Sequence, residues 1–409
     1  MAEYSEYKDS GIPWIGKIPS HWDVKPIRSF LSQSKELNED ENATLLTLSQ
    51  YKGINIRNGN EDSAISAAES LVGYNVVHKG QFVMNIMLAW NGSYGVSDYD
   101  GVISPAYAIF NFNNDVCKAY YHYLWRTKAY QDAFKTRSKG IVDSRLRLYP
   151  QYFLPFYTSI PPKEEQEAIV AYLDKVTADI DKSIAAKERI IASLEERRKI
   201  IITHAVTRGI NSDAPLKDSG IDWLGQIPAH WETRKLKYLA RLKSGINLTS
   251  EDISPEAFNG SFPVYGGNGL RGYYSKYNVT GEFALIGRQG ALCGNINYAN
   301  GKFWATDHAV VCYPLHHYPI QWFGEMLRVA DLNQYATQSA QPGLSVERIK
   351  NIEMPFPPAE EIGEINQYLS SKLVQFDIPI AQQKKLIELL RERKNIIINE
   401  TVTGKVKVI

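Results

Sequence analysis

The chain contains two near-copies of one 15-residue segment. Residues 8–22 read KDSGIPWIGKIPSHW and residues 217–231 read KDSGIDWLGQIPAHW, with 11 of the 15 paired positions identical. A second repeat starts at Pro161 and at Pro357, where 50 residues align without a gap and 19 pairs are identical. The first repeat has a period of 209 residues and the second a period of 196, which is too long for a solenoid unit. The sequence therefore predicts two domain-sized halves, each with an opening segment, a middle and a closing helix.

The middles of the two halves run over 23–160 and 232–356, and the 13-residue difference between the periods lies in them. The scaffold is thus duplicated while the middles have diverged, and each middle is long enough to bury its own core. The four parts that we expect are a first globular domain with its opening segment (1–160), a central helical region (161–211), a second globular domain with its opening segment (212–356) and a distal helical region (357–409).

The composition is typical of a soluble globular protein in a reducing compartment. Hydrophobic residues make up 44% and charged residues 22% of the 409 residues. No run of 18 apolar residues exists, so no transmembrane helix or membrane partner is expected, and the N-terminus lacks the pattern of a signal peptide. The three cysteines (Cys117, Cys293 and Cys312) form no CxxC pair and leave an odd thiol, which favours the cytoplasm.

The net charge does not indicate nucleic-acid binding, but two local basic runs are compatible with it. The formal net charge is only +1. The stretch from Arg126 to Arg147 contains seven basic and two acidic residues. The stretch from Arg234 to Lys243 contains five basic residues, and the next acidic residue in the sequence is Glu251. Such patches suit a phosphate backbone, and a solvated basic face explains them equally well.

Both closing segments begin with Pro-Pro-x-Glu-Glu, and proline followed by acids suits the first turn of a helix. Apolar residues then recur at spacings of three and four, which is typical of a narrow coiled-coil seam with polar interruptions at Lys187 and Gln383. The seam residues that we expect to pack together are Ile180, Ile184, Ile191, Leu194, Ile201, Phe376, Ile380, Ile387, Leu390 and Ile397.

Pro379 predicts a break in the second closing segment, because proline in a helix interior removes a hydrogen bond and kinks the chain. With Asp377 as an N-cap, we expect a short helix followed by a longer one near 377–400, and its partner near 181–204. Each would have 24 residues and a length of about 36 Å, close to the roughly 34–36 Å of one DNA turn. Paired antiparallel, the two helices would set a fixed spacing between the middles. The same seams also suit homodimerisation or the docking of a partner.

The middles predict mixed strands and helices. Apolar runs broken by turn residues over 79–112 and 261–314 indicate strands, with glycine-rich corners in the second stretch. Helical stretches follow at 118–134 and 319–336. The fold class that we expect is α+β, with two globular domains separated by an antiparallel coiled coil of two long helices.

The duplicated layout resembles the specificity (S) subunit of Type I restriction–modification systems. The resemblance is carried by the paired DSGIxWxGxIPxHW openings and the paired PPxEE…IIIxxxVTxG helices. Phrases such as PVYGGNGLRGY, ALIGRQGALCGNINY and LAWNGSYGVSDYDGVISPAY are similar to those of the target-recognition domains in that family. Each phrase alone is weak, but their order in both halves is specific, and the resemblance covers essentially the whole chain.

The resemblance implies a pseudo-two-fold, non-catalytic subunit that reads an asymmetric bipartite target in double-stranded DNA. Two target-recognition domains would each read a few base pairs, about one DNA turn apart. The helices would dock two methyltransferase (M) subunits, onto which restriction/translocase (R) subunits assemble. The chain itself would carry no cofactor; S-adenosylmethionine would belong to the M subunit, and ATP and Mg to the R subunit. The alternative is a coiled-coil interaction scaffold that reads no DNA.

The motifs of catalysis are weak or missing in the sequence. The Asn/Asp-Pro-Pro-aromatic loop of adenine methylation and the GxxxxGK[ST] phosphate loop do not occur. The glycines from Gly266 to Gly269 fit a turn better than a nucleotide fingerprint. His308, Cys312 and His316 have a helical metal spacing, but their β-branched surroundings indicate a strand, so we expect no metal. Cys293 lies in a glycine turn where nothing activates it as a nucleophile.

Reading of bases requires donor and acceptor side chains on loops that approach DNA closely, such as arginine for guanine and asparagine or glutamine for adenine. For each such residue, a solvated or turn-stabilising role is the alternative. The DNA-binding candidates are Tyr51, Lys52, Asn91, Ser93, Tyr94, Lys139 and Arg145 in the first half and Tyr265, Asn268, Arg271, Arg288, Gln289, Gln338 and Gln341 in the second. The four tryptophans of the opening segments, by contrast, are expected to seat each domain on the helices.

Overall fold

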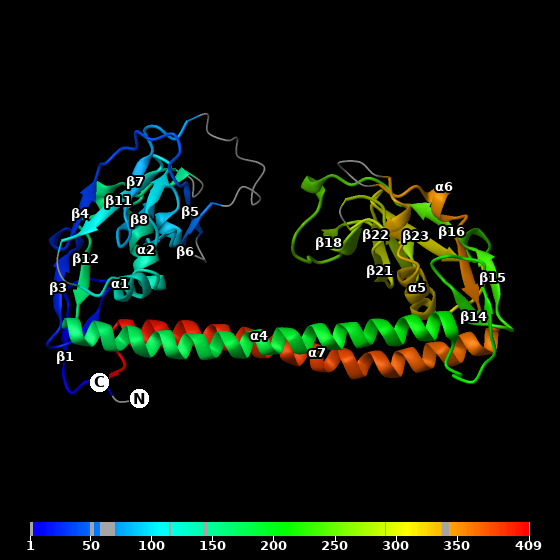
Figure 1. The fold of residues 1–409 in the computed structure, drawn as a ribbon. Coiled ribbons are helices and arrows are strands. Elements are labelled where there is room, and N and C mark those ends of the chain that lie inside the picture. Colours follow the sequence, from blue (N-terminus) through cyan, green and yellow to red (C-terminus); the bar gives the residue numbers. More distant parts are fainter. Residues whose placement is uncertain are drawn as a thin grey trace. The chain divides into compact units, whose positions relative to one another are not determined.

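A computed structural model describes residues 3–49, 53–57, 70–113, 116–141, 145–290, 292–337 and 343–408. The chain divides into unit 1, Met1–Ala186 with Leu386–Ile409, and unit 2, Lys187–Lys385. Two long helices, α4 (Lys163–Arg208) and α7 (Ala359–Val402), contribute residues to both units (Figure 1).

Unit 1 is built on a four-stranded antiparallel sheet in the order β4-β11-β8-β9. These strands are β4 (Leu31–Ser34), β11 (Tyr107–Phe112), β8 (Phe82–Asn85) and β9 (Tyr94–Val96). Antiparallel pairs add β1 (Tyr7–Asp9) with β2 (Lys17–Pro19), β3 (Asp23–Pro26) with β12 (Tyr157–Ile160), β5 (Leu46–Ser49) with β6 (Gly53–Ile56) and β7 (Asn75–Val77) with β10 (Gly101–Ile103). The helical elements are α1 (Lys118–Leu124), α2 (Lys128–Arg137), α3 (Pro150–Phe153), η1 (Ile27–Ser29) and η2 (Ala89–Asn91).

Unit 2 repeats that sheet in the order β16-β23-β20-β21 and adds a second sheet, β18-β17-β22-β19. The first has β16 (Ala240–Ser244), β23 (Ala309–Pro314), β20 (Phe283–Gly287) and β21 (Ile296–Ala299). The second has β18 (Gly269–Tyr274), β17 (Phe262–Gly266), β22 (Lys302–Ala305) and β19 (Val279–Thr280). The remaining elements are β13 (Leu216–Asp218), β14 (Gln226–Pro228), β15 (Glu232–Lys235), β24 (Glu353–Phe356), α5 (Ile320–Val329), α6 (Val346–Ile349), η4 (Leu236–Tyr238), η5 (Ser250–Asp252) and η6 (Leu332–Tyr335).

In each unit a helix of the globular part lies between the sheet and the long helices, α1 in unit 1 and α5 in unit 2 (Figure 1). Aromatic side chains fill the core of unit 1, where Phe82 stacks on Phe153 with ring centroids 5.8 Å apart. Ile365 and Leu369 of α7 lie in the core of unit 2 together with Trp322 of α5. The α+β class expected from the sequence is confirmed by these mixed elements.

The opening segments contact the first turn of the long helices in both units. His21 lies 2.8 Å from a carboxylate oxygen of Glu165 in α4, and His230 lies 2.8 Å from one of Glu361 in α7. Trp22 and Trp231, the residues that follow these histidines, are fully buried. In each unit, the opening segment and the first turn of a long helix therefore form one joint between the globular part and the helix. This explains why the two sequence repeats occur together.

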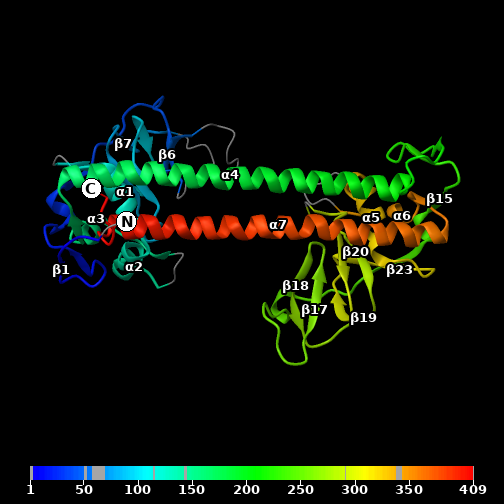
Figure 2. The ribbon, with the colours of Figure 1, turned by 90° about the horizontal axis from the view of Figure 1, so that it is seen from below.

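The two ends of the described chain also meet within unit 1 (Figure 2). The Tyr7 hydroxyl donates a hydrogen bond to the carbonyl oxygen of Lys405 at 3.3 Å, and Tyr120 donates one to that of Val402 at 2.8 Å. A Cβ atom on Gly404, which has a φ of +74°, would lie 2.5 Å from Pro19. The C-terminal end of α7 is thus part of the same core as the first opening segment.

Within each unit α4 packs on α7, and the predicted seam residues lie along the contact. Ile180, Ile184, Ile191, Ile380 and Ile387 are buried, and Leu194, Ile201, Phe376, Leu390 and Ile397 are half-buried. The predicted polar interruption Lys187 donates a hydrogen bond to Gln383 at 3.4 Å. Asp181 pairs with Lys394 at 2.7 Å in unit 1, and the repeat-equivalent residues Asp377 and Arg198 pair at 3.3 Å in unit 2.

The predicted break at Pro379 is wrong, because α7 continues through it from Ala359 to Val402. A proline removes only one backbone hydrogen bond, and Ile380 is buried in the contact with α4 immediately after it. Asp377 binds Arg198 across the contact and does not begin a helix. The long helices therefore have 46 and 44 residues, and not the 24 expected near 181–204 and 377–400.

Candidate nucleic-acid interface

Two glycine-rich turns of unit 2 are packed directly against each other. A Cβ atom on Gly287, at the end of β20, would lie 2.3 Å from the carbonyl oxygen of Gly267, in the turn between β17 and β18. Real Cβ atoms do not approach a carbonyl this closely, so only glycine permits the contact. Gly269, with a φ of +99°, completes the same turn. The glycine-rich corners noted in the sequence over 261–314 are thus needed where two backbone segments pack against each other.

Four candidate residues extend from these packed turns. Asn268 and Arg271 come from the β17–β18 hairpin, and Arg288 and Gln289 directly follow β20. Asn268, Arg271 and Gln289 are exposed, and Arg288 is partly exposed. The structure therefore brings together two arginines, one asparagine and one glutamine, which are the side-chain types that bind guanine and adenine edges.

The two arginines are held by hydroxyl groups that the sequence did not single out. Arg288 donates a hydrogen bond to the Ser244 side chain at 3.5 Å, and Arg271 donates one to Ser250 at 3.3 Å. The backbone of Arg288 is fixed by hydrogen bonds to His308 at 2.9 Å and from Leu344 at 2.8 Å. Because no carboxylate neutralises these guanidinium groups in the described part of the chain, they keep donors for a ligand.

Tyr265 has a supporting position next to this cluster. Its ring meets Phe303 edge-on at 5.5 Å, and burial raises the pKa of its hydroxyl. Its carbonyl oxygen accepts a hydrogen bond from Thr306 at 2.9 Å. These contacts fix strand β17, and Tyr265, which is half-buried, stays a predicted DNA-binding residue.

The first-half candidates are less concentrated. Lys139 and Arg147 form a bridge through two backbone hydrogen bonds of 2.8 and 2.9 Å, and Arg145 between them is exposed. The Lys139 ammonium lies over the ring of Tyr152 at 5.1 Å. Asn91 lies elsewhere, in a cleft lined also by α7. Lys139 and Arg145 therefore stay together as candidates, separate from Asn91.

Ser93 and Tyr94 do not suit contact with DNA in this structure. Ser93 is 3% exposed, and Tyr94 is fully buried with its hydroxyl donating to the carbonyl of Trp125. Burial raises the pKa of Tyr94. The turn residues before β9 looked polar and accessible in the sequence, but strand β9 pairs with β8 and directs Tyr94 into the core. We correct these two candidates to core positions.

Four further candidates, Tyr51, Lys52, Gln338 and Gln341, lie outside the described residues. Gly343 forms an isolated antiparallel β-bridge with Gln289, so residue 343 lies beside the glycine-rich cluster.

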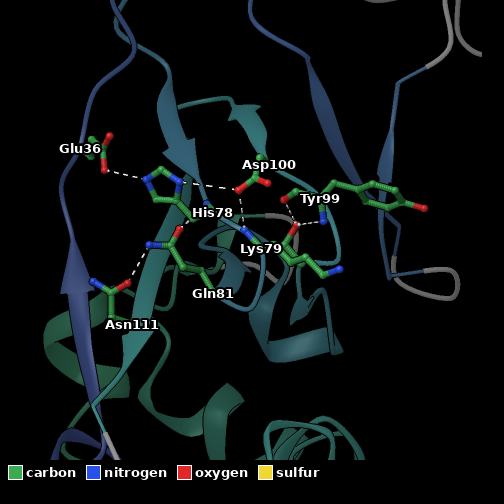
Figure 3. A network of polar contacts seen from close by, with 8 residues as sticks. Glu36, His78, Lys79, Gln81, Tyr99, Asp100 and Asn111 are labelled. Carbon is green, nitrogen blue, oxygen red and sulfur yellow. Dashed lines mark hydrogen bonds and ion pairs between the residues drawn. The ribbon is translucent and has the colours of Figure 1, made fainter.

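A polar network at the edge of unit 1 also resembles a site at first sight (Figure 3). His78 lies 3.0 Å from Glu36 and 3.7 Å from Asp100, but the side chains of all three are more than half exposed. The backbone of Lys79 donates to Asp100 at 3.0 Å, and Gln81 donates to Asn111 at 2.7 Å. These contacts tie the turn before β8 to neighbouring turns and to β11, so the network fixes loops.

Metal and thiol chemistry find no support among the described residues. No group of three or more histidine, cysteine, aspartate or glutamate side chains there is arranged to hold a metal ion. Cys312 lies in strand β23 and is fully buried, which raises the pKa of its thiol. Burial also raises the pKa of Cys293, so neither thiol is activated as a nucleophile.

Comparison with known proteins relates the chain to one family. A family described as "Type I restriction modification DNA specificity domain" matches residues 228–391. The Type I restriction enzyme EcoprrI specificity subunit of Escherichia coli is 37% identical over 147 residues, which are 35% of this chain and 35% of that one. The MjaVIII specificity subunit of Methanocaldococcus jannaschii is 22% identical over 356 residues, 79% of each chain. Residues 228–391 therefore match this family, and the chain is similar to Type I specificity subunits.

A solved structure shows the same fold along nearly the whole chain. It was determined in work on complex assembly and conformational transition of the type I R-M system, and it covers 95% of this chain and 99% of its own at a TM-score of 0.66 and 15% identity. The predicted resemblance to a specificity subunit is confirmed by these similarities. The aligned part spans only about a third of the Escherichia coli relative. Among the described residues, no helix is long and apolar enough to cross a membrane.

Proposed function

We propose that the chain reads an asymmetric bipartite site in double-stranded DNA, each globular domain reading one half. The observation that carries this proposal is the glycine-packed cluster of unit 2, which presents Arg271, Arg288, Asn268 and Gln289 without acidic partners among the described residues. Bidentate contacts of arginine with guanine and of amide side chains with adenine would supply discrimination of about 1–3 kcal/mol each. The chain itself would perform no chemistry.

The two halves would read different sequences, because the same sheet carries different turns. Unit 1 has Lys139 and Arg145 beside the end of α2, whereas unit 2 has the hairpin of β17 and β18. Nothing in unit 1 among the described strands matches the second sheet of unit 2. An asymmetric target is the expected consequence.

The long helices would set the spacing of about one DNA turn and dock the partners. Several apolar side chains on these helices are exposed to water, which is unfavourable, and this supports the docking of protein partners there. They are Ile190, Ile200, Val374 and Ile378 in unit 2 and Leu386, Leu389 and Ile396 in unit 1.

We propose two methyltransferase subunits as these partners, with restriction/translocase subunits assembling onto them. S-adenosylmethionine would then be bound by the methyltransferase, and ATP and Mg by the restriction subunit. Support comes from the family, whose members are named as subunits of restriction enzymes.

Methylation mapping tests the proposal in a host that expresses the chain with its methyltransferase subunit. A split motif with methylated adenines in both arms is expected. Exchange of residues 23–160 for the middle of another family member should change one arm only. A change in both arms, or a continuous motif, would contradict two independent readers.

A coiled-coil scaffold without DNA reading remains the second candidate, favoured by the exposed apolar residues of α4 and α7. Arg288→Ala separates the two functions. A DNA reader should lose about 1–3 kcal/mol of binding at one half-site and keep its affinity for the methyltransferase subunit. A pure scaffold would show no dependence of assembly on DNA sequence.

A further inference from the structure

Two clefts of nearly equal volume lie at repeat-equivalent places in the two units. Cleft 1, about 990 Å³, lies in unit 1 between the α1–α2 region and the last turns of α7. Cleft 2, about 980 Å³, lies in unit 2 between α5 and the last turns of α4. Their helical walls carry matching residues, 196 positions apart: Glu392, Ile396 and Ile398 in cleft 1, and Glu196, Ile200 and Ile202 in cleft 2.

The opposite wall of each cleft carries an arginine in the same setting. The Arg126 guanidinium lies over the ring of Tyr94 at 5.6 Å and donates to the Tyr94 carbonyl at 2.6 Å. The Arg328 guanidinium lies over the ring of Tyr298 at 5.7 Å and donates to the Ile296 carbonyl at 2.9 Å. Tyr94 and Tyr298 lie on the edge strands β9 and β21 of the equivalent sheets.

The two arginines differ in what neutralises them. Arg328 pairs with both carboxylate oxygens of Glu325 at 2.7 and 2.9 Å, and Glu325 is 1% exposed. Arg126 instead contacts the ring of His122, with Nη1 2.7 Å from Nδ1. Burial, and then the charge of Arg126, lower the pKa of His122 to about 3, so the ring is neutral at pH 7. In the described part of unit 1, no carboxylate pairs with Arg126.

We propose that cleft 1 binds the carboxylate of an aspartate or glutamate side chain from a docked partner protein, and that Arg126 holds it. Cleft 2 shows which group completes this arrangement, since Glu325 supplies a protein carboxylate to the matching arginine. A partly buried guanidinium without an anion is costly to desolvate, and a bidentate carboxylate offsets that cost. The inference rests on the proposed docking of methyltransferase subunits and assigns one contact of that docking.

The walls of cleft 1 favour a protein over a nucleic acid. Glu392 and Glu400 line it together with Lys128 and Lys394, and these two lysines already pair with Asp132 and Asp181. The cleft therefore has mixed charge around Arg126, which suits one carboxylate better than the row of phosphates of a nucleic acid. Ile396, which is 48% exposed, and Tyr123 provide apolar surface next to Arg126. An acidic residue flanked by apolar ones, as on an amphipathic helix, matches this combination. Because Arg328 already has its carboxylate, only cleft 1 would require an acid from the partner.

The first experiment compares thermal unfolding of the full chain in sodium acetate, sodium phosphate and sodium chloride at equal ionic strength. Acetate as the probe should raise the midpoint by about 2 °C over chloride, since a ligand stabilises the state that binds it. Arg126→Gln should abolish this difference. Lys128→Gln, a matched loss of charge at the same cleft whose lysine already pairs with Asp132 at 2.6 Å, should retain it.

His122→Glu provides a second variant in case Arg126→Gln fails to fold. It places a carboxylate one turn before Arg126, as Glu325 stands before Arg328, and should remove the acetate response while the chain remains folded by circular dichroism. An acetate response that survives both substitutions, or no difference between acetate and chloride, overturns the proposal. A response to phosphate alone that disappears in Arg126→Gln also overturns it, because it assigns a phosphate site.

Binding to the methyltransferase subunit completes the test. Arg126→Gln should weaken assembly about tenfold and Lys128→Gln should leave it unchanged. If the wild-type chain fails to bind the subunit at all, the proposed function fails, while the acetate result still reports on the cleft. If the subunit binds and Arg126→Gln has no effect, the assignment of the cleft fails and the proposed function stands.

Discussion

In unit 1 the carboxylate of Glu165 accepts hydrogen bonds from His21 and Tyr4, and in unit 2 that of Glu361 accepts them from His230 and Trp231. These joints between globular part and long helix are close copies. The strands outside the equivalent four-stranded sheets differ, because unit 2 has the glycine-packed hairpin of β17 and β18 and unit 1 has the pairs β5–β6 and β7–β10. Duplication has therefore kept the attachment of each domain and changed the surface proposed to meet the target.

The two units also differ in the donor that the joint carboxylate receives and in the group beside the cleft arginine. The Trp231 indole donates to Glu361 at 2.9 Å, whereas the Trp22 indole nitrogen has no partner among the described residues and Tyr4 takes the place of the donor. Arg328 has Glu325 where Arg126 has His122. Unit 1 thus uses Tyr4 at the joint and His122 beside its cleft arginine, where unit 2 uses Trp231 and Glu325.

Gly287→Ala should have the largest effect, because a Cβ atom there would meet the Gly267 carbonyl at 2.3 Å. The two turns would have to separate, at a cost of about 3 kcal/mol, and binding to one half-site should be lost while the other is kept. Gly363→Ala in α7 is the control, since nothing lies within 4 Å of it, and it should stabilise the chain by about 0.5–1 kcal/mol. Unaltered stability of Gly287→Ala would show that the turns are loosely packed.

Pro379→Ala tests whether the two long helices are equivalent. The matching residue of α4 is Ser183, and only α7 lacks the hydrogen bond to the carbonyl four residues earlier. Alanine should restore it and raise the free energy of unfolding by about 2 kcal/mol, measured by urea denaturation. Ser183→Ala, as the control, should change stability by less than about 0.5 kcal/mol. Destabilisation by Pro379→Ala would mean that α7 depends on a proline-induced bend.

The sequence repeats allowed the two long helices and their contact to be predicted. Spacings of three and four placed Ile184 and Ile380 on the seam, and both are buried. The break expected at Pro379 failed because local propensity was weighed without the tertiary contact. In the structure, Ile380 and the pair of Asp377 with Arg198 hold the helix on both sides of the proline.

The site was less accessible to sequence reasoning, since residue type does not reveal direction. Ser93 and Tyr94 follow a turn like the other candidates, but both are buried where strand β9 begins and pairs with β8. The pairing of Arg126 with Tyr94 joins residues 32 positions apart and depends on how α1 packs on the sheet. Only the finished fold shows that Arg328 is its counterpart.

Glu361→Ala probes the joint of unit 2. The buried Trp231 indole would lose its acceptor, which should cost about 1.5 kcal/mol, whereas Glu360→Ala, one residue earlier and exposed, should cost under about 0.5 kcal/mol. Glu165→Ala and Glu164→Ala form the same comparison in unit 1. Equal losses at Glu361 and Glu165 would show that Tyr4 replaces the tryptophan donor fully, and a smaller loss in unit 1 would show that it does not.

The smallest expected effect is a pH dependence that only unit 1 provides through His122. The folded chain holds the pKa of His122 at about 3, below the ordinary value near 6.5, so the unfolded chain binds more protons as the pH falls. Stability should therefore drop by about 0.7 kcal/mol between pH 7 and pH 6 because of this residue. Arg126 faces the ring, and Lys128, Lys394, Glu392 and Glu400 line the same cleft. The lysines keep their charge over this range, so they do not produce the change.

In His122→Gln the loss of stability between pH 7 and pH 6, measured by urea denaturation at each pH, should be smaller by that amount. If the wild-type chain and His122→Gln lose the same stability between pH 7 and pH 6, His122 is solvated in the folded chain. The contrast between a neutral His122 beside Arg126 and a charged Glu325 beside Arg328 would then be wrong.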